Sequence, residues 1–125
     1  MATKLTRYRL SGTTAADGTA TINSNSVVRG RIHTIVADVG ALDDTADITI
    51  TTPDEVVSQT ILNLTNQAAD VVVRPKVLCT DNAGGALTAT GNTFTEYCVF
   101  SRLRANIVQG GATLAFKIDI YVEEY

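Results

Sequence analysis

Apolar and polar residues alternate along most of this chain, and the alternation is clearest at its C-terminal end. Within residues 112–123, five apolar side chains (Leu114, Phe116, Ile118, Ile120 and Val122) alternate with four polar ones (Lys117, Asp119, Tyr121 and Glu123). Successive side chains of a β-strand point to opposite faces of the sheet. The pattern therefore predicts a final strand with one buried face and one face in water.

Similar alternation, in segments dominated by Thr, Val, Ile and Ala, predicts further strands. These lie at residues 3–10, 19–23, 27–39, 46–52, 56–65, 71–80, 93–100 and 102–109. Turn residues separate them, and no segment has a convincing helical period. The expected fold is all-β, an antiparallel β-sandwich or jelly roll of about eight strands with no significant helix.

Two residues predict irregularities within these strands. In 27–39, the alternation places Val28, Gly30, Ile32, Thr34 and Val36 on one face, with Arg29, Arg31 and His33 on the other. Gly30 indicates a bulge or a close neighbour there. Pro75 cannot donate a hydrogen bond to a neighbouring strand, so it favours an edge position or a bulge within 71–80.

The length of 125 residues and the 45% hydrophobic content favour one β-sandwich domain over residues 1–125. We expect residues 1–9 to be a possible extended N-terminal arm, and residues 81–92, which contain Gly84, Gly85 and Gly91, to be a mobile loop. The apolar runs are too short to span a bilayer, and the first twelve residues do not resemble a secretion signal. Synthesis and residence in the cytosol are therefore expected.

Eight of the ten basic residues fall into four pairs with a spacing of two. The pairs are Arg7 and Arg9, Arg29 and Arg31, Arg74 and Lys76, and Arg102 and Arg104. On a strand this spacing places both charges of a pair on one face. Such residues often only solubilise a sheet, but arginine is also enriched at protein interfaces and binds carboxylates in bidentate geometry. We predict that these eight residues line an interface with another protein.

Other chemistry receives little support from the sequence. The net charge of −3 argues against nonspecific nucleic-acid binding. His33 is the only histidine, and no second group is positioned by sequence to form a catalytic pair with it. The spacing of Asp43, Asp44 and Asp47 lacks the glycine and distal glutamate of a calcium loop. We expect no enzymatic activity, no metal and no cofactor.

Two residue groups leave alternatives open. Cys79 and Cys98 lie in strand-like segments and are expected to be reduced, packed thiols, although a cross-strand disulfide is an alternative. The four tyrosines, Tyr8, Tyr97, Tyr121 and Tyr125, are expected at a partly buried rim. The alternative is a soluble carbohydrate- or ligand-binding β-sandwich, with these tyrosines in the site and the glycine-rich loop as a lid.

Three segments resemble small capsid-associated proteins of tailed bacteriophages, the decoration or cement proteins. They are the long strand RGRIHTIVADV from residue 29, the threonine-rich strand ADITITT from residue 46, and the closing segment ANIVQGGATLAFKIDIYVEEY from residue 105. The closing segment combines a strand, a double-glycine turn and the final alternating strand. The resemblance covers most of the chain after residue 28 and contains no invariant signature.

This resemblance implies a small β-sandwich or jelly roll that binds the outer face of the major capsid protein shell as a dimer or trimer. It implies a virion structural protein, made in the host cytoplasm, that bridges capsid subunits and stabilises the shell. No direct contact with nucleic acid or membrane is expected. A head–tail or tail component is the alternative within the virion. The two ends of the chain are expected to add strands to a neighbouring sheet.

Overall fold

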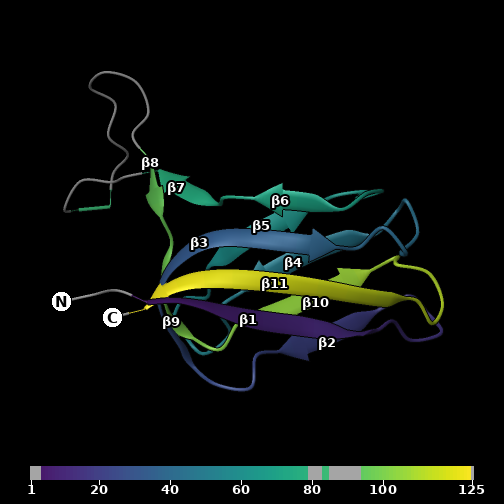
Figure 1. The fold of residues 1–125 in the computed structure, drawn as a ribbon, viewed down its shortest axis with the longest axis horizontal. Coiled ribbons are helices and arrows are strands. Elements are labelled where there is room, and N and C mark those ends of the chain that lie inside the picture. Colours follow the sequence, from purple (N-terminus) through teal and green to yellow (C-terminus); the bar gives the residue numbers. More distant parts are fainter. Residues whose placement is uncertain (1–3, 79–82, 85–93, 125) are drawn as a thin grey trace.

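The computed structural model describes residues 4–78, 83–84 and 94–124, which contain eleven β-strands and no helix (Figure 1). The strands are β1 (Lys4–Thr13), β2 (Ala20–Asn23), β3 (Val28–Asp38), β4 (Asp47–Thr51), β5 (Thr60–Leu64), β6 (Val71–Val73), β7 (Lys76–Leu78), β8 (Phe94–Glu96), β9 (Cys98–Ser101), β10 (Arg104–Val108) and β11 (Ala115–Glu124). The prediction of an all-β chain is confirmed. The described residues accordingly provide no helix that could cross a membrane.

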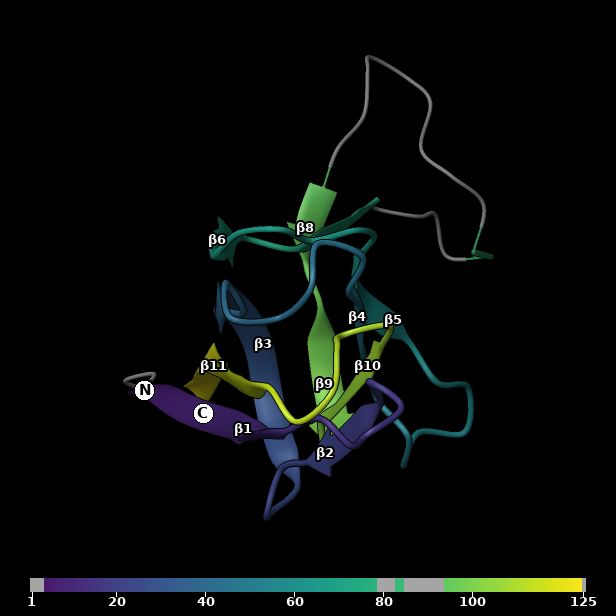
Figure 2. The same ribbon diagram turned by 90° about the vertical axis from the view of Figure 1, so that its right-hand side faces the viewer.

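The strands form two main sheets and one small one. The front sheet has the order β1-β11-β3-β6, and β9 also pairs with β3. The back sheet has the order β2-β10-β4-β5, and β7 pairs with β8 alone. Every pairing is antiparallel. Seen along the sheets, the front and back sheets form separate layers (Figure 2).

The pairing is nested along the chain. The first strand pairs with the last, β1 with β11, and inside this pair β2 pairs with β10. Further inside, β3 pairs with β6 and β4 pairs with β5. The β11–β3 and β10–β4 pairings then join these pairs into the two sheets.

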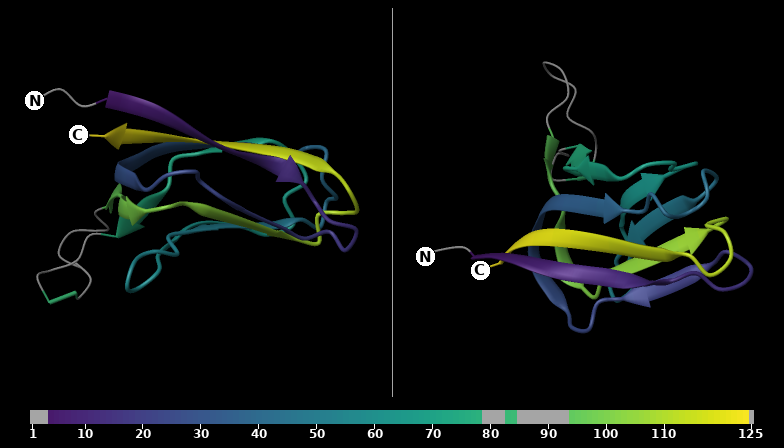
Figure 3. Two further views of the ribbon diagram at one scale, coloured as in Figure 1. Left: turned by 90° about the horizontal axis from the view of Figure 1, so that it is seen from below. Right: turned by 45° about the vertical axis from the view of Figure 1, so that its right-hand side comes forward.

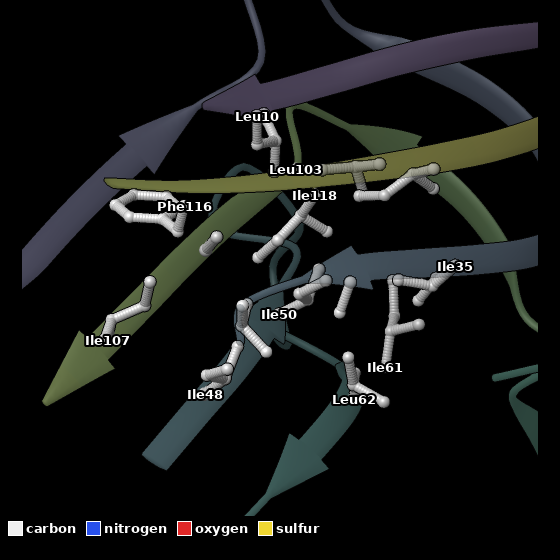
Figure 4. Close-up of a cluster of buried hydrophobic side chains, with 14 of the residues drawn as sticks. Leu10, Ile35, Ile48, Ile50, Ile61, Leu62, Leu103, Ile107, Phe116 and Ile118 are labelled. Atoms are coloured by element: carbon white, nitrogen blue, oxygen red, sulfur yellow. The ribbon is translucent and has the colours of Figure 1, made fainter. Parts of the chain in front are cut away.

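Inward side chains of both main sheets form one hydrophobic cluster (Figure 4). In β11, Phe116, Ile118, Ile120 and Val122 are buried, as the alternation predicts. The back sheet contributes Ile48 and Ile50 of β4 and Ile107 of β10, among others. Because each sheet presents one apolar face, burial of both faces holds the two layers together.

Two of the nine predicted strand segments are interrupted, which raises the number of strands in the described residues to eleven. The predicted strand 71–80 breaks into β6 and β7 at Arg74 and Pro75, just past the edge strand of the front sheet. The predicted strand 93–100 breaks at Tyr97, between β8 and β9. The strand predicted at 56–65 begins only at Thr60, because the preceding residues form the turn between β4 and β5.

The predicted face assignment of residues 27–39 is wrong beyond Ile32. The register between β11 and β3 shifts between Tyr121 and Val122, which pair with Thr34 and Ile32 and leave His33 as an extra residue. Beyond this bulge, Ile35 and Ala37 enter the hydrophobic core, whereas Thr34, although buried, lies opposite Tyr121 and outside that core. One inserted residue reverses the faces because the side-chain period of a strand is two.

Gly30 confirms the prediction of a close neighbour. Its φ is +150°, and a Cβ atom built there would lie 2.1 Å from the backbone oxygen of Glu123. The start of β3 therefore passes so close to the end of β11 that only glycine fits.

The N-terminal segment that was expected to be an arm belongs to the sheet. Residues 4–9 pair with β11 in unbroken register, from Lys4 opposite Glu124 to Arg9 opposite Asp119. For this part of the chain the arm prediction is wrong, because the alternation that suggested a strand is satisfied within the domain. The predicted mobile loop at 81–92 lies outside the described residues, apart from Ala83 and Gly84.

We predict that Gly30→Ala lowers the free energy of unfolding by about 1–3 kcal/mol or more, since it adds both a disfavoured φ and an overlap with Glu123. Gly12→Ala is the control, because a Cβ atom there would meet only the flexible side chains of Ile22 and Phe116, at 3.1 and 3.3 Å. Urea unfolding of both variants measures the difference. Equal stability of the two variants would contradict the close approach.

Candidate interaction surface

The eight basic residues predicted at an interface do not form one surface. Arg7 and Arg9 lie on β1 and Arg29 and Arg31 on β3, the two strands that flank β11 in the front sheet. Arg104 begins β10 in the back sheet, and Arg102 lies between β9 and β10. Arg74 follows β6 and Lys76 begins β7.

Two of the arginines are held in bidentate ion pairs within the chain. Arg9 donates to both carboxylate oxygens of Asp119, at 2.7 and 2.9 Å. Arg102 binds Asp54 in the same way, at 3.0 and 2.9 Å. The hydrogen bond from Arg9 lowers the pKa of Asp119, and each carboxylate raises the pKa of its arginine. These guanidinium groups already have acidic partners, so they are poor anchors for another protein.

The remaining basic residues differ in how far they are engaged. Arg31 lies 3.7 Å from a carboxylate oxygen of Glu123 on the neighbouring strand, and Arg104 donates to the side chain of Asn23 at 2.9 Å. The other four form no ion pair with any residue in the described ranges. These four are Arg7, Arg29, Arg74 and Lys76.

Arg29 stacks over the ring of Phe100, with its guanidinium carbon 5.4 Å from the ring centroid. The two residues are directly opposite each other on β3 and β9. They border a hollow of about 710 Å³, which Val27, Arg29, Gly30, Cys98, Val99, Phe100 and Glu124 line. A cation on an aromatic ring beside a partly apolar hollow can contact both charged and apolar groups.

Large exposed apolar side chains gather at the end of the molecule that contains this hollow. Among the described residues, five large exposed apolar side chains belong to β1, to β9, to the residue before β3 and to the turn between β4 and β5. They are Leu5, Val27, Val56, Val57 and Phe100, which we call the end patch. The start of β1, the end of β11 and the turn between β4 and β5 also lie at this end (Figure 3). Phe100 is 64% exposed and Val56 is fully exposed. Exposed apolar side chains at one end of a molecule make that end a candidate contact surface.

The turn between β4 and β5 is fastened to the outer edge of β9. Glu55 accepts a hydrogen bond from the backbone N–H of Phe100 at 3.0 Å, and Asp54 accepts one from that of Arg102 at 3.0 Å. The side chain of Gln59 donates to the backbone oxygen of Cys98 at 3.1 Å. Three side chains thus take up backbone groups that a further strand would otherwise bind, and they fix the turn that carries Val56 and Val57 beside Phe100.

At the rim of the hollow, Tyr8 donates a hydrogen bond from its hydroxyl to Glu124 at 2.6 Å. Burial, followed by this hydrogen bond, raises the pKa of Tyr8 to about 12. The phenol therefore stays protonated at neutral pH and holds the carboxylate of the last described residue in place.

The residues considered for other chemistry are not brought together. The ring of His33 lies 2.6 Å from the hydroxyl of Thr34. Within the described ranges, no three His, Cys, Asp or Glu side chains are grouped so that they could hold a metal ion. Cys98 is a free thiol and is exposed rather than packed, while Cys79 lies outside the described residues. Tyr97 packs against the hydrophobic core, whereas Tyr121 lies on β11 opposite Arg7, so they do not form an aromatic platform.

The end patch is not apparent from the sequence pattern. Phe100 belongs to a strand that was predicted, and the burial of its neighbour Val99 leaves Phe100 on the outer face. The alternation of the sequence therefore places a phenylalanine on the outer face of a strand. Such a residue is a signal of an exposed apolar site. Val56 and Val57 were assigned to a strand, so their exposure in a turn was not foreseen.

The chain matches no protein-family model, and no curated protein or solved structure matches it.

We predict that the ion pair of Asp54 stabilises the fold only while Asp54 is charged. The hydrogen bonds from Arg102, first from its side chain and then from its backbone, lower the pKa of Asp54 from 3.8 to about 2. A depressed pKa means that the stabilisation is complete above about pH 4 and is lost as the pH falls towards about pH 2. Asp54→Asn should therefore make the melting temperature fall less steeply over this range.

Asp44→Asn is the control, because Asp44 is an exposed turn residue with no hydrogen bond to another described side chain. It should keep the slope of the wild type. Thermal unfolding at a series of pH values provides the comparison, and identical slopes for Asp54→Asn and the wild type would refute the prediction.

Proposed function

We propose that the two main sheets form a jelly roll. This assignment is supported by the nested pairing of β1 with β11, β2 with β10, β3 with β6 and β4 with β5. Numbered in order without β7, β8 and β9, these eight strands give sheet orders 1-8-3-6 and 2-7-4-5. A long antiparallel hairpin that rolls up around one core produces this order, and jelly rolls occur in capsid proteins, lectins and other classes. The fold alone therefore does not select the function.

We infer that the chain is a non-enzymatic structural protein of a tailed-phage virion. It binds the outer surface of the major capsid protein shell and stabilises the shell by bridging its subunits, as a dimer or trimer. The assignment to a phage capsid rests on the resemblance of the segments from residues 29, 46 and 105. Selective binding to the assembled shell stabilises it by mass action, and many copies add avidity.

One observation carries the protein-binding part of this proposal: Arg29 stacked on the exposed ring of Phe100 within the end patch. Aromatic residues and arginine are enriched at protein interfaces and provide most of their binding energy. The end patch adds exposed aliphatic side chains at the same end of the molecule, and the turn that carries Val56 and Val57 is hydrogen-bonded to β9. We place the capsid contact at this end of the molecule.

Two other functions remain as alternatives for testing. A head–tail or tail component would use the same kind of surface at a different place in the virion. Binding of a small ligand would use the hollow beside Arg29 and Phe100, whose size of about 710 Å³ lies in the range of ligand sites. The separation of Tyr97 from Tyr121 removes the reason to expect a carbohydrate there.

We predict that this chain cosediments with shells formed by the major capsid protein encoded in the same genome when the two are expressed together. Electron microscopy of the sedimented particles should reveal added density on their outer surface. Binding only to the portal vertex or to tails would favour the head–tail alternative. Shells that sediment without this chain would contradict the decoration function.

We predict that Arg29→Glu weakens shell binding by about 10-fold or more, equivalent to about 1.4 kcal/mol, because it removes a cation and its stacking on Phe100. Lys117→Glu makes the same charge change on an exposed residue of β11, at the far end of the front sheet, and should bind as the wild type does. Titration of shells with each purified variant measures both affinities. Equal loss in both variants would show that only net charge matters.

A further inference from the structure

The outer edge of β1 is unpaired over its N-terminal half. Within the described residues β1 pairs only with β11, and Ile22 of β2 lies beside Gly12 near the C-terminal end of β1. Figure 1 shows β1 along one border of the front sheet. Residues 4–9 therefore present a strand edge in the same region as the end patch. An edge of this kind is a template for pairing with another chain.

The register identifies which backbone groups face outward. The backbone N–H of Thr14 donates to the oxygen of Leu114, and the pairing then continues without a shift to Lys4 opposite Glu124. In an antiparallel pair, hydrogen-bonded and non-hydrogen-bonded positions alternate. The backbone N–H and C=O groups of the even-numbered residues of β1 therefore form the hydrogen bonds to β11. The N–H and C=O groups of Leu5, Arg7 and Arg9 point away from it, towards the free edge.

The side chains at these outward positions argue against a second copy of the chain. In an antiparallel β1–β1 contact centred on Arg7, the two Arg7 side chains would be opposite each other, and a shift of the centre to Tyr8 would pair Arg7 with Arg9. Like charges directly opposite each other destabilise a strand pair. Basic side chains on an edge are a known protection against such self-association.

The same side chains favour an acidic partner. Arg7 is exposed and forms no ion pair within the described ranges, whereas Arg9 is already bound to Asp119. Leu5, two residues before Arg7 on the same face, is 56% exposed and belongs to the end patch. A strand added to this edge would place one side chain opposite Leu5 and another opposite Arg7. An apolar residue and a carboxylate, two positions apart, would match them.

We infer that the edge of β1 receives an extended acidic segment of the capsid protein, which adds to the front sheet as a further strand. This inference rests on the proposed function and names the contact through which it acts. Backbone hydrogen bonds to Leu5, Arg7 and Arg9 supply the affinity, and the side chains opposite Leu5 and Arg7 supply the specificity.

Hydrogen–deuterium exchange of the wild-type chain, free and on saturated shells of the coexpressed capsid protein, tests the inference. The outward amides of β1 exchange freely in the unbound chain and should become protected on the shell. Shells that bind the chain while exchange in residues 4–9 stays unchanged would overturn this inference and leave the proposed function standing. Shells that do not bind the chain would overturn both.

Leu5→Pro supplies a second measurement, because proline removes an outward N–H without removing a bond to β11. It should weaken shell binding by about 10-fold beyond the effect of Leu5→Ala, which keeps that N–H. Melting temperatures of both variants establish that they are folded. Equal affinities of two folded variants would overturn the added strand, and if Leu5→Pro does not fold, the exchange measurement on the wild type decides the question.

Discussion

The structure depends on the strand β11, whose inward side chains are buried between the sheets while its backbone joins β1 to β3. Phe116, Ile118, Ile120 and Val122 are each at most 4% exposed. Burial of a side chain of this size contributes about 1.5–3 kcal/mol, so this strand is a major source of stability. Both neighbouring strands take their register from it. Removal of β11 would separate the first strand from the remainder of the front sheet.

The outward side chains of β11 determine which arginines can act in an interface. Asp119 binds Arg9 from β1, and Glu123 lies beside Arg31 from β3. The alternation that builds the core therefore also neutralises basic residues on the outer face. In the proposed function, two arginines remain for binding. Arg29 stacks on Phe100 at the end of the sheet, and Arg7 is exposed at its edge. Fold and proposed function are connected through the register of one strand.

Much of the fold could be predicted from the sequence because alternation reports a physical requirement, the burial of one face. The strand at β11 was predicted on this ground, and Gly30 was predicted to mark a bulge or a close neighbour. The insertion at His33 was not predictable, because it is visible only in the pairing with β11. A break in the strand near Pro75 could be predicted, because proline lacks the N–H group that a strand pair needs. That β6 and β7 then join different sheets depends on the tertiary structure.

The candidate site was less predictable than the fold. Spacing alone indicated that Arg9 and Arg102 face solvent, yet each is bound by an aspartate more than forty residues away in sequence. Such pairs form only when register and sheet order are known. The exposure of Val56 and Val57 likewise results from a turn that side chains of Asp54, Glu55 and Gln59 fasten to β9. Cross-strand partners, rather than local composition, decide which side chains are available.

The most direct test of the central claim is the orientation of the chain on a capsid, measured by cryo-electron microscopy of saturated shells at side-chain resolution. We predict that the end that contains Arg29, Phe100 and the turn between β4 and β5 faces the major capsid protein. A map in which the opposite end, with the double-glycine turn at Gly110 and Gly111, makes the contact would contradict it, as would shells without bound chain.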